Sequence, residues 1–282
     1  MKDLTFGQYY PSDSVVHRMD ARVKILLMIL YIAAIFFISS YFGYAVTLIF
    51  ILAFSLVSKV PITKILKSVK RITVILVITA LLNLFFVKTG KIIAHWWIFT
   101  ITDYGLNYAI MMALRLTFLV IGTTFLTLTT TPTELTDGLE SLMTPLKYVK
   151  IPVHDIAVIM SIALRFIPTL MEETQKIMNA QKARGATFDT GHLHQRAKAL
   201  LPVLIPLFVN AFRRADELAF AMDARCYNAT EKRTKMKKEK LGWGDLVAFL
   251  LICAYFVVIL LERYYFPTIG INIDAMIFGG LL

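Results

Sequence analysis

The sequence predicts an all-α polytopic membrane protein with about five transmembrane helices and long amphipathic cytoplasmic helices. Apolar residues make up 57% of the 282 residues and charged residues only 17%, which is typical of a membrane protein. Several apolar runs approach the roughly 20 residues that a helix needs to cross a bilayer core of about 30 Å. A further region, residues 131–240, is amphipathic and rich in proline. The chain therefore has room for about five spans and one sizeable block outside the lipid.

The first long apolar run predicts two spans rather than one. Residues 25–58 contain no charged side chain, and as a single helix they would reach about 51 Å. The sequence SSYFGY, centred on Tyr41 to Gly43, supplies interfacial aromatic and turn-permissive residues within this run. We therefore expect two short spans joined by a tight hairpin.

Three later runs complete the predicted set of spans. They cover residues 72–87, 104–128 and 246–261. Residues 92–105 are short and contain two adjacent tryptophans, so we expect an interfacial excursion there. The tail 266–282 is apolar, but it is too short and rich in glycine to count as a span.

The positions of lysine and arginine predict the orientation in the membrane. Of the 30 basic residues, 26 fall in the N-terminal 24 residues, the segment 59–71 and the region 131–240. Short cytoplasmic loops retain such residues, so we expect the N-terminus and the region 131–240 inside and the C-terminus outside. The basic cluster 231–240 is expected on the same cytoplasmic side, where it can contact anionic lipid head groups. This topology accounts for the net charge of +11 without a nucleic-acid partner.

The region between the fourth and fifth spans predicts three amphipathic helices. The first runs from Thr133 to about Val149, with Thr131 or Thr133 as its N-cap and Glu134 in its first turn. The second and third cover about 153–183 and 195–225, with apolar residues three and four apart on one face. The expected divisions of the chain are residues 1–130, 131–240 and 241–282.

The second and third of these helices end in similar sequences. One finishes in Ala183, Arg184 and Gly185, and the other in Ala224, Arg225 and Cys226. An arginine at a helix C-terminus can simply complement the helix dipole, worth about 0.3 to 1 kcal/mol. The presence of two such ends, each on a long amphipathic helix, favours a function in which both arginines act together. A rigid helix end presenting an arginine can enter a groove on another protein and make charge-assisted contacts there.

The chain resembles the transmembrane T component of the energy-coupling factor (ECF) transporters, vitamin and metal-ion uptake systems of the ATP-binding-cassette superfamily in prokaryotic cell membranes. The resemblance covers nearly the whole chain. It rests on four stretches, GQYYPSDSVVHRMDARVK, TTTPTELTDGLESLMTPLK, ALRFIPTLMEETQKIMNAQKARGA and IPLFVNAFRRADELAFAMDARCY.

The resemblance implies two kinds of partner. In that family, two Ala-Arg-Xaa signatures end coupling helices that dock into two ATPase subunits, and Arg184 and Arg225 match those positions. The family usually has glycine third in both signatures, whereas this chain has Cys226 in the second. The resemblance also implies that the chain holds a small substrate-binding membrane protein, the S component, against its hydrophobic helices.

Other functional classes lack their motifs. No Gly-x-x-x-x-Gly-Lys-Ser/Thr loop, His-Glu-x-x-His helix or Gly-x-Ser-x-Gly elbow is present, so we expect a non-catalytic subunit that needs no cofactor. His192 and His194 have no third ligand nearby, and no metal site is expected. Arg115 lies within an apolar run, where it can pair with Asn83 or with neighbouring threonines. The alternative function is an autonomous secondary transporter in which Arg115 and Asn83 line a path.

Overall fold

The computed structural model describes most of the chain and divides it into two compact units. The first unit comprises residues 1–149 and 240–282, and the second comprises residues 150–239. The first boundary follows Val149, so the helix after the fourth span belongs to the first unit. The residues described are 9–86, 92–96, 99–149, 152–186, 188, 193–227 and 242–269. The basic cluster 231–240 and the tail from residue 270 onward lie outside them.

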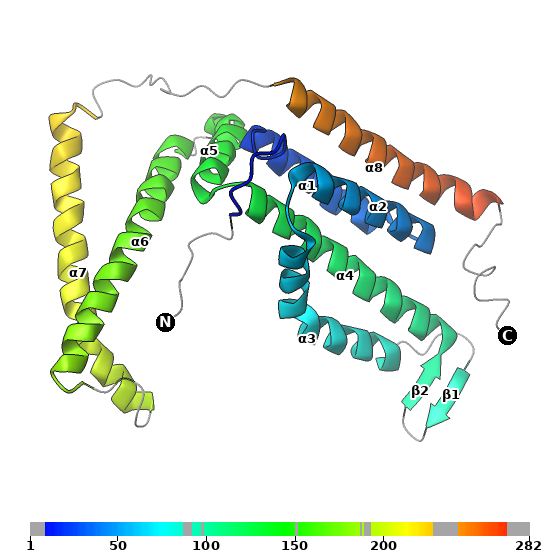
Figure 1. Cartoon of the computed structure of the whole chain (residues 1–282), viewed down its shortest axis with the longest axis horizontal. Coiled ribbons are helices and arrows are strands. Elements are labelled where there is room, and N and C mark those ends of the chain that lie inside the picture. The colour runs from blue at the N-terminus through cyan, green and yellow to red at the C-terminus, as the bar shows by residue number, and fades with distance from the viewer. Residues whose placement is uncertain are drawn as a thin grey trace. The chain divides into compact units, whose positions relative to one another are not determined.

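The first unit is a helical bundle with one short β-hairpin (Figure 1). Helix α1 packs against α4, α5 and α8, while α2 packs against α4 and α8 and α3 packs against α4. In chain order the elements are α1 (Ala21–Phe37), α2 (Tyr41–Ser58), α3 (Ile62–Phe86), β1 (Ile92–Trp96), β2 (Phe99–Thr102), α4 (Asp103–Thr129), α5 (Pro132–Met143), the 3₁₀ helix η1 (Thr144–Val149) and α8 (Trp243–Ile269).

The helical membrane fold is confirmed, although the set of apolar helices differs from the predicted one. Five described helices are long and apolar enough to cross a membrane, namely α2, α3, α4, α8 and α6 (Val153–Ala183) of the second unit. Helix α1 is also apolar and has 17 residues, one fewer than α2. Helix α6 was predicted to be an amphipathic helix outside the lipid, yet it contains a sufficiently apolar stretch.

One predicted loop boundary is wrong. The basic segment 59–71 is a loop only up to Pro61, and from Ile62 it forms the first turns of α3. Lys64, Lys67 and Lys70 lie within those turns, so these basic residues belong to the helix rather than to a loop. The helix that contains the predicted last span, residues 246–261, extends beyond it and ends at Ile269.

The hairpin and α5 show how local sequence sets the shorter elements. Residues 92–96 and 99–102 form an antiparallel pair where an interfacial excursion was expected. Thr131 is the N-cap of α5: its hydroxyl accepts from the Glu134 amide at 3.3 Å, and the Glu134 carboxylate accepts from the Thr131 amide at 3.1 Å. This capping box confirms one of the two predicted caps. The α-helix stops at Met143, and Pro145 lies in the 3₁₀ continuation.

Aromatic and aliphatic side chains form the core of the first unit. Tyr31, Phe50 and Tyr255 stack on one another from three helices, with 4.6 Å between the ring centroids of Phe50 and Tyr255. The Tyr255 hydroxyl lies 2.8 Å from the Thr47 hydroxyl, and both side chains are buried. Polar tips inside the bundle are thus paired across helices, as a low-dielectric interior requires.

An N-terminal strap, residues 9–20, ties together one end of this bundle. The Tyr10 amide donates to the carbonyl of Leu128 at the end of α4 at 2.9 Å. The Ser12 hydroxyl donates to the Ser58 carbonyl at the end of α2 at 3.2 Å. The Asp20 amide donates to Asp245, near the start of α8, at 3.1 Å. The strap therefore crosses the ends of three helices.

His17 makes the strap sensitive to pH. Burial lowers the pKa of His17 below its ordinary 6.5, with Lys24 lowering it further and the Tyr10 carbonyl and Glu134 opposing the shift. Because the unfolded segment binds a proton more readily, the stability that the strap contributes is full above pH 6.5 and falls as the pH drops below it. We expect faster hydrogen exchange of residues 9–20 at pH 5 than at pH 7.5, after correction for intrinsic rates. His17→Gln should abolish that difference, and a difference that persists in the variant would contradict this origin.

The second unit consists of two long helices that pack together. Helix α6 runs from Val153 to Ala183 and α7 from Leu193 to Ala224, close to the predicted bounds. The helices lie side by side in opposite directions, so their C-terminal ends are at opposite ends of the pair (Figure 1). Helix α7 is bent in its first half (Figure 1), which contains Pro202 and Pro206, and such kinks follow from the missing proline amide.

Candidate functional site

Helix α6 ends in a complete Schellman motif. The Ala186 amide donates to the Gln181 carbonyl at 3.0 Å, and the Gly185 amide donates to the Lys182 carbonyl at 3.0 Å. These are the two bonds that define the motif. Gly185 has φ 88°, a left-handed conformation that glycine adopts without steric penalty. Arg184 is the residue immediately before the reversal.

Helix α7 ends in the same motif, with cysteine at the left-handed position. The Tyr227 amide donates to the Met222 carbonyl at 3.1 Å, and the Cys226 amide donates to the Asp223 carbonyl at 2.9 Å. Cys226 has φ 55°. The departure from glycine therefore leaves the hydrogen-bond pattern of the helix end intact. The backbone conformation costs about 1 kcal/mol for a residue with a Cβ.

Both arginines project from the helix ends into open space. Arg184 and Arg225 are exposed, as are the alanines that precede them. Within the described residues, neither guanidinium makes an ion pair or a hydrogen bond. Each guanidinium keeps its planar fork of donors for a partner, and that fork matches carboxylates and backbone carbonyls at the surface of another protein.

Exchanging the left-handed residues should separate backbone strain from side-chain chemistry. We expect Cys226→Gly to stabilise the end of α7 by up to about 1 kcal/mol, because glycine relieves the strained conformation. Gly185→Val should destabilise the end of α6 by about 1 to 2 kcal/mol, because a β-branched residue is strained at φ 88°. Hydrogen exchange of the Ala186 and Tyr227 amides measures both effects. Equal protection in the wild type and the two variants would contradict the argument.

A polar junction joins α6 to α7 between the two ends. The Glu173 carboxylate of α6 accepts a hydrogen bond from the Asn210 side chain of α7 at 2.5 Å. The Arg214 guanidinium of α7 lies 3.4 Å from the same carboxylate, and the Glu173 side chain is only 19% exposed. Glu173 precedes Arg184 by 11 residues, and Arg214 precedes Arg225 by the same 11. The junction thus lies about 16 Å of helix from each arginine end.

Removing this junction should weaken the contact between the helices. We expect Glu173→Ala to lower the stability of the α6 and α7 pair by about 1 to 3 kcal/mol, because it leaves Asn210 and Arg214 without their acceptor. The exposed neighbour Glu172 supplies a matched control, since Glu172→Ala removes the same charge away from α7. Disulfide cross-linking between cysteines introduced on the two helices measures the separation. Equal cross-linking rates in the two variants would argue against the junction.

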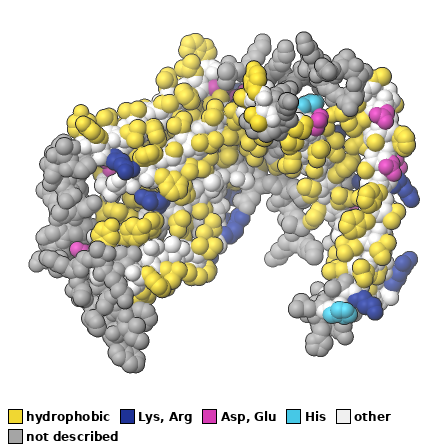
Figure 2. All heavy atoms as spheres, turned by 180° about the vertical axis from the view of Figure 1, so that it is seen from behind, with side chains coloured by type: hydrophobic (Ala, Val, Ile, Leu, Met, Phe, Trp, Pro, Cys, Tyr) yellow, Lys and Arg dark blue, Asp and Glu magenta, His cyan; other side chains and the backbone are white. Residues whose placement is uncertain are grey.

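Much of the apolar surface of α6 and α7 is uncovered. Val153 and Val203 are the buried hydrophobic residues among the described part of the second unit. Figure 2 shows apolar side chains across most of the visible face of each unit. The most exposed ones in the second unit are Phe220, Phe212, Ile159 and Ile205. Such a surface is larger than a soluble monomer tolerates, and it is typical of a membrane or protein contact.

Arg115 and Asn83 are not joined within the described structure. The Arg115 guanidinium donates to the Ile38 carbonyl, in the turn between α1 and α2, at 3.1 Å. The Asn83 amide donates to the Thr79 carbonyl of its own helix at 2.9 Å. The acceptor for Arg115 is therefore a backbone carbonyl of the helix turn rather than Asn83 or a threonine.

The sequence profile of the cobalt transport protein family, CbiQ, matches residues 12–236. That range contains α1 to α7 and both arginine-bearing ends. The chain belongs to this family. Curated relatives that cover nearly the whole chain agree, and each is named energy-coupling factor transporter transmembrane protein EcfT. The chain is thus a multi-pass membrane protein of the ECF transporter T components.

Three relatives illustrate the extent of the similarity. The protein from Clostridium kluyveri is 49% identical over 266 residues, which are 93% of this chain and 98% of the relative. The protein from Thermosediminibacter oceani is 48% identical over 250 residues, covering 89% and 94% of the two chains. The protein from Bacillus subtilis is 45% identical over 238 residues, covering 84% and 90%.

Two acidic residues were missed by sequence reasoning. Glu173 follows Leu170 by three residues and precedes Ile177 by four, so it falls in register with the apolar positions of α6, and this spacing is the signal that could have identified it. Glu262 lies at the end of an apolar run and is buried, where its carboxylate accepts from the Ser40 hydroxyl and, at 3.1 Å, from the Gly43 amide. An acidic residue within an apolar span is the signal that could have identified Glu262.

Proposed function

We propose that this T component couples two cytoplasmic ATPase subunits to a small substrate-binding membrane protein, for ATP-driven uptake of vitamins or transition-metal ions. The single observation that carries the proposal is the pair of helix ends with the same capped backbone and an exposed arginine. Family membership and the uncovered apolar surface support it. In this assignment, Ala183, Arg184 and Gly185 dock in one ATPase subunit, and Ala224, Arg225 and Cys226 dock in the other.

The docking contact is strong because the helix ends are preorganised. Each Schellman motif fixes the backbone next to the arginine, so little chain entropy is lost when the guanidinium enters a groove. The alanine before each arginine is small, so it does not sterically prevent the helix end from approaching the ATPase subunit. Charge-assisted hydrogen bonds to carboxylates or carbonyls then link the motion of each ATPase subunit to its helix.

The second unit can transmit this motion because its two helices are linked. When the ATPase subunits close or open around ATP, both arginine ends move with them. The Glu173 junction joins α6 to α7 about 16 Å from either end, so a displacement at one end also tilts the other helix. The apolar faces of the helices then carry that tilt to the S component that rests on them.

The distribution of charge supports the orientation that this mechanism needs. The N-terminal segment, residues 59–71 and the region 131–240 hold 26 of the 30 basic residues, and short loops rich in lysine and arginine remain in the cytoplasm. This supports a cytoplasmic location for the arginine ends, on the side where ATP is available. The subunit itself performs no catalysis, and its ATPase partners hydrolyse ATP.

Purification of the chain from native membranes tests the assembly. We expect two ATP-binding-cassette subunits and a small membrane protein to co-purify with it in mild detergent. An Arg184→Glu, Arg225→Glu variant should retain the small membrane protein and lose the ATPase subunits. Recovery of the chain without any of these proteins would overturn the proposal. The autonomous transporter would instead take up substrate in vesicles that contain this chain alone.

A further inference from the structure

The first turns of α3, residues 62–71, have two exposed sides of opposite character. Three basic residues are three and four positions apart and therefore lie on one side of the helix, namely Lys64, Lys67 and Arg71. Three apolar residues with the same spacing lie on the opposite side, namely Ile62, Leu66 and Val69. The basic residues are exposed, and Leu66 and Ile62 are 60% and 49% exposed. These turns are therefore amphipathic, with most of both sides uncovered.

The bundle holds these turns by the side that lies between the other two. Ile65 and Ser68 are the buried residues of α3. Ile65 belongs to the same core cluster as Val60 and Leu128, which are near the end of α2 and the end of α4. This contact fixes one side of the turns to the bundle core. The basic side and the apolar side are left uncovered by the described residues.

The rest of α3 has the properties of a helix that faces lipid. Residues 72–86 contain no charged side chain, and none of their side chains is buried. These later turns run beside α4, whereas the first turns run across the direction of the bundle helices (Figure 1). A basic amphipathic segment directly before such a stretch is typical of the head-group level. The first turns therefore lie along the membrane surface.

The charge of the basic side is not neutralised by the protein around it. No acidic residue occurs in the sequence between Asp20 and Asp103. Within the part of the chain that the structure describes, no ion pair holds Lys64 or Lys67. The Lys64 Nζ lies 5.8 Å from the ring centroid of Tyr10 in the N-terminal strap, a contact that leaves its positive charge in place. An anionic partner thus complements this side.

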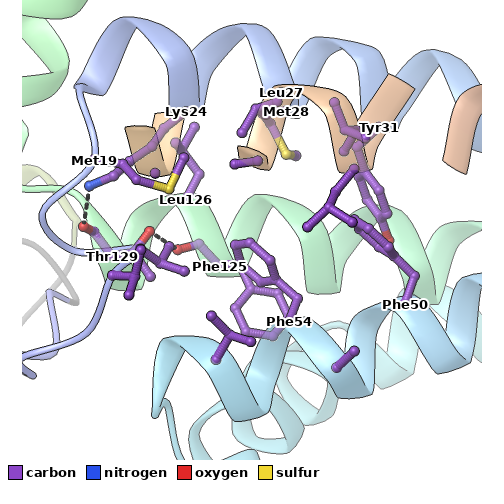
Figure 3. Close-up of a pocket in the computed structure, with 18 of the residues that line it drawn as sticks. Met19, Lys24, Leu27, Met28, Tyr31, Phe50, Phe54, Phe125, Leu126 and Thr129 are labelled. Atoms are coloured by element: carbon purple, nitrogen blue, oxygen red, sulfur yellow. Dashed lines mark hydrogen bonds between the residues drawn. The ribbon is translucent and has the colours of Figure 1, made fainter. Parts of the chain in front are cut away.

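Lys24 shows the opposite arrangement at the same end of the bundle. Its side chain is buried, and its Nζ donates to the Thr129 carbonyl at 3.0 Å (Figure 3). That ammonium serves the contact between α1 and the end of α4. The lysines of α3 make no such bond to the bundle, so they differ from Lys24 in being accessible from outside.

We propose that residues 62–71 form an interfacial arm that binds the head groups of anionic phospholipids. Ile62 and Leu66 lie among the upper parts of the acyl chains, and Lys64 and Lys67 extend to the phosphates. Buried apolar area and charge attraction then act on the same ten residues. Because the remaining contacts of α3 are with α4 and β2, the lipid contact sets the depth at which α3 begins. This surface is separate from the arginine-bearing helix ends.

Spin labels on the two sides test how the arm lies. The full chain with Cys226→Ser and Cys253→Ser receives one label, at Leu66→Cys or at Lys64→Cys, in vesicles of phosphatidylglycerol and phosphatidylcholine. We expect the label at 66 to collide with oxygen, which concentrates in the bilayer, and the label at 64 to collide with a water-soluble nickel complex. Collision of both labels with the nickel complex would overturn the proposal. Shielding of both from either reagent would also overturn it, because a protein would then cover the arm.

Removing the two lysines tests the preference for anionic lipid. Phosphatidylglycerol or phosphatidylcholine is added to the purified chain in detergent, and the midpoint of thermal unfolding is followed. We expect phosphatidylglycerol to raise the midpoint more than phosphatidylcholine does, and high salt to reduce the difference. Lys64→Gln with Lys67→Gln should lose more than half of that difference, whatever the stability of the variant without lipid.

A matched control removes the same charge elsewhere. Lys176 and Lys198 are exposed on α6 and α7 of the second unit. Lys176→Gln with Lys198→Gln should keep the preference for phosphatidylglycerol that the wild type shows. An equal preference in the two double variants would overturn the arm as the lipid-binding surface.

Discussion

The Arg184→Ala, Arg225→Ala double variant should lose ATP-driven uptake while it still inserts into the membrane. Both guanidinium groups are exposed at capped helix ends, so their removal leaves no buried charge and disturbs no packing. What is lost is a set of charge-assisted contacts to each ATPase subunit, with about 1.5 to 3 kcal/mol for each hydrogen bond to a charged group. Uptake of radiolabelled substrate into cells, beside the amount of chain in the membrane, measures the two effects.

A matched double variant separates position from charge. Arg165 and Arg213 are exposed on α6 and α7 but lie away from the helix ends. Arg165→Ala with Arg213→Ala removes the same net charge, and we expect it to retain most of the uptake. Wild-type uptake in the Arg184 and Arg225 variant, or equal loss in both pairs, would refute the docking role.

Glu262→Leu should destabilise the first unit by about 3 kcal/mol, because it leaves buried donors without an acceptor in a bundle that water does not reach. The carboxylate accepts from the Ser40 hydroxyl and the Gly43 amide, at the turn that joins α1 to α2. Tyr44 lies beside it and also interacts with Arg115. The same change thus affects the place where three helices meet.

Glu262→Gln provides the control, since it retains an acceptor oxygen and nearly the same shape. We expect it to lose less than half as much stability as the leucine variant. The midpoint of thermal unfolding of the purified chain in detergent measures both. A leucine variant as stable as the wild type would show that α8 does not depend on this contact.

The positions of most helices were predictable because their signals are local. Long apolar runs, a threonine followed three residues later by a glutamate, and regular spacing of apolar residues determine α2, α4, α5 and α6 without reference to the rest of the chain. The sequence-based predictions failed where contacts between residues far apart in the chain determine the structure. The predicted last span stopped at residue 261, yet α8 continues through Glu262, which accepts hydrogen bonds from the turn between α1 and α2, and Arg263, which lies 5.4 Å from the ring centroid of Phe37.

The candidate site was predictable in part. Its two arginines and their small neighbours were visible as a repeated pattern. The equivalence of the two ends was not, because cysteine rarely adopts φ 55° and only the backbone shows that Cys226 does. The partner of Arg115 could not be predicted either. It is a backbone carbonyl 77 residues away, and no side-chain pattern in the sequence identifies it.

The sequence by itself determined that this protein is a helical membrane protein with two arginine-bearing helix ends and with most of its basic residues in three segments of the chain. These properties follow from composition and from spacings within one or two turns of helix. Only the tertiary structure decided which buried polar groups meet, how α6 is joined to α7 and which side of the first turns of α3 packs on the bundle. Those features depend on side chains far apart in sequence approaching within a few ångströms, and hydrophobic patterning specifies which face is buried without specifying its partner.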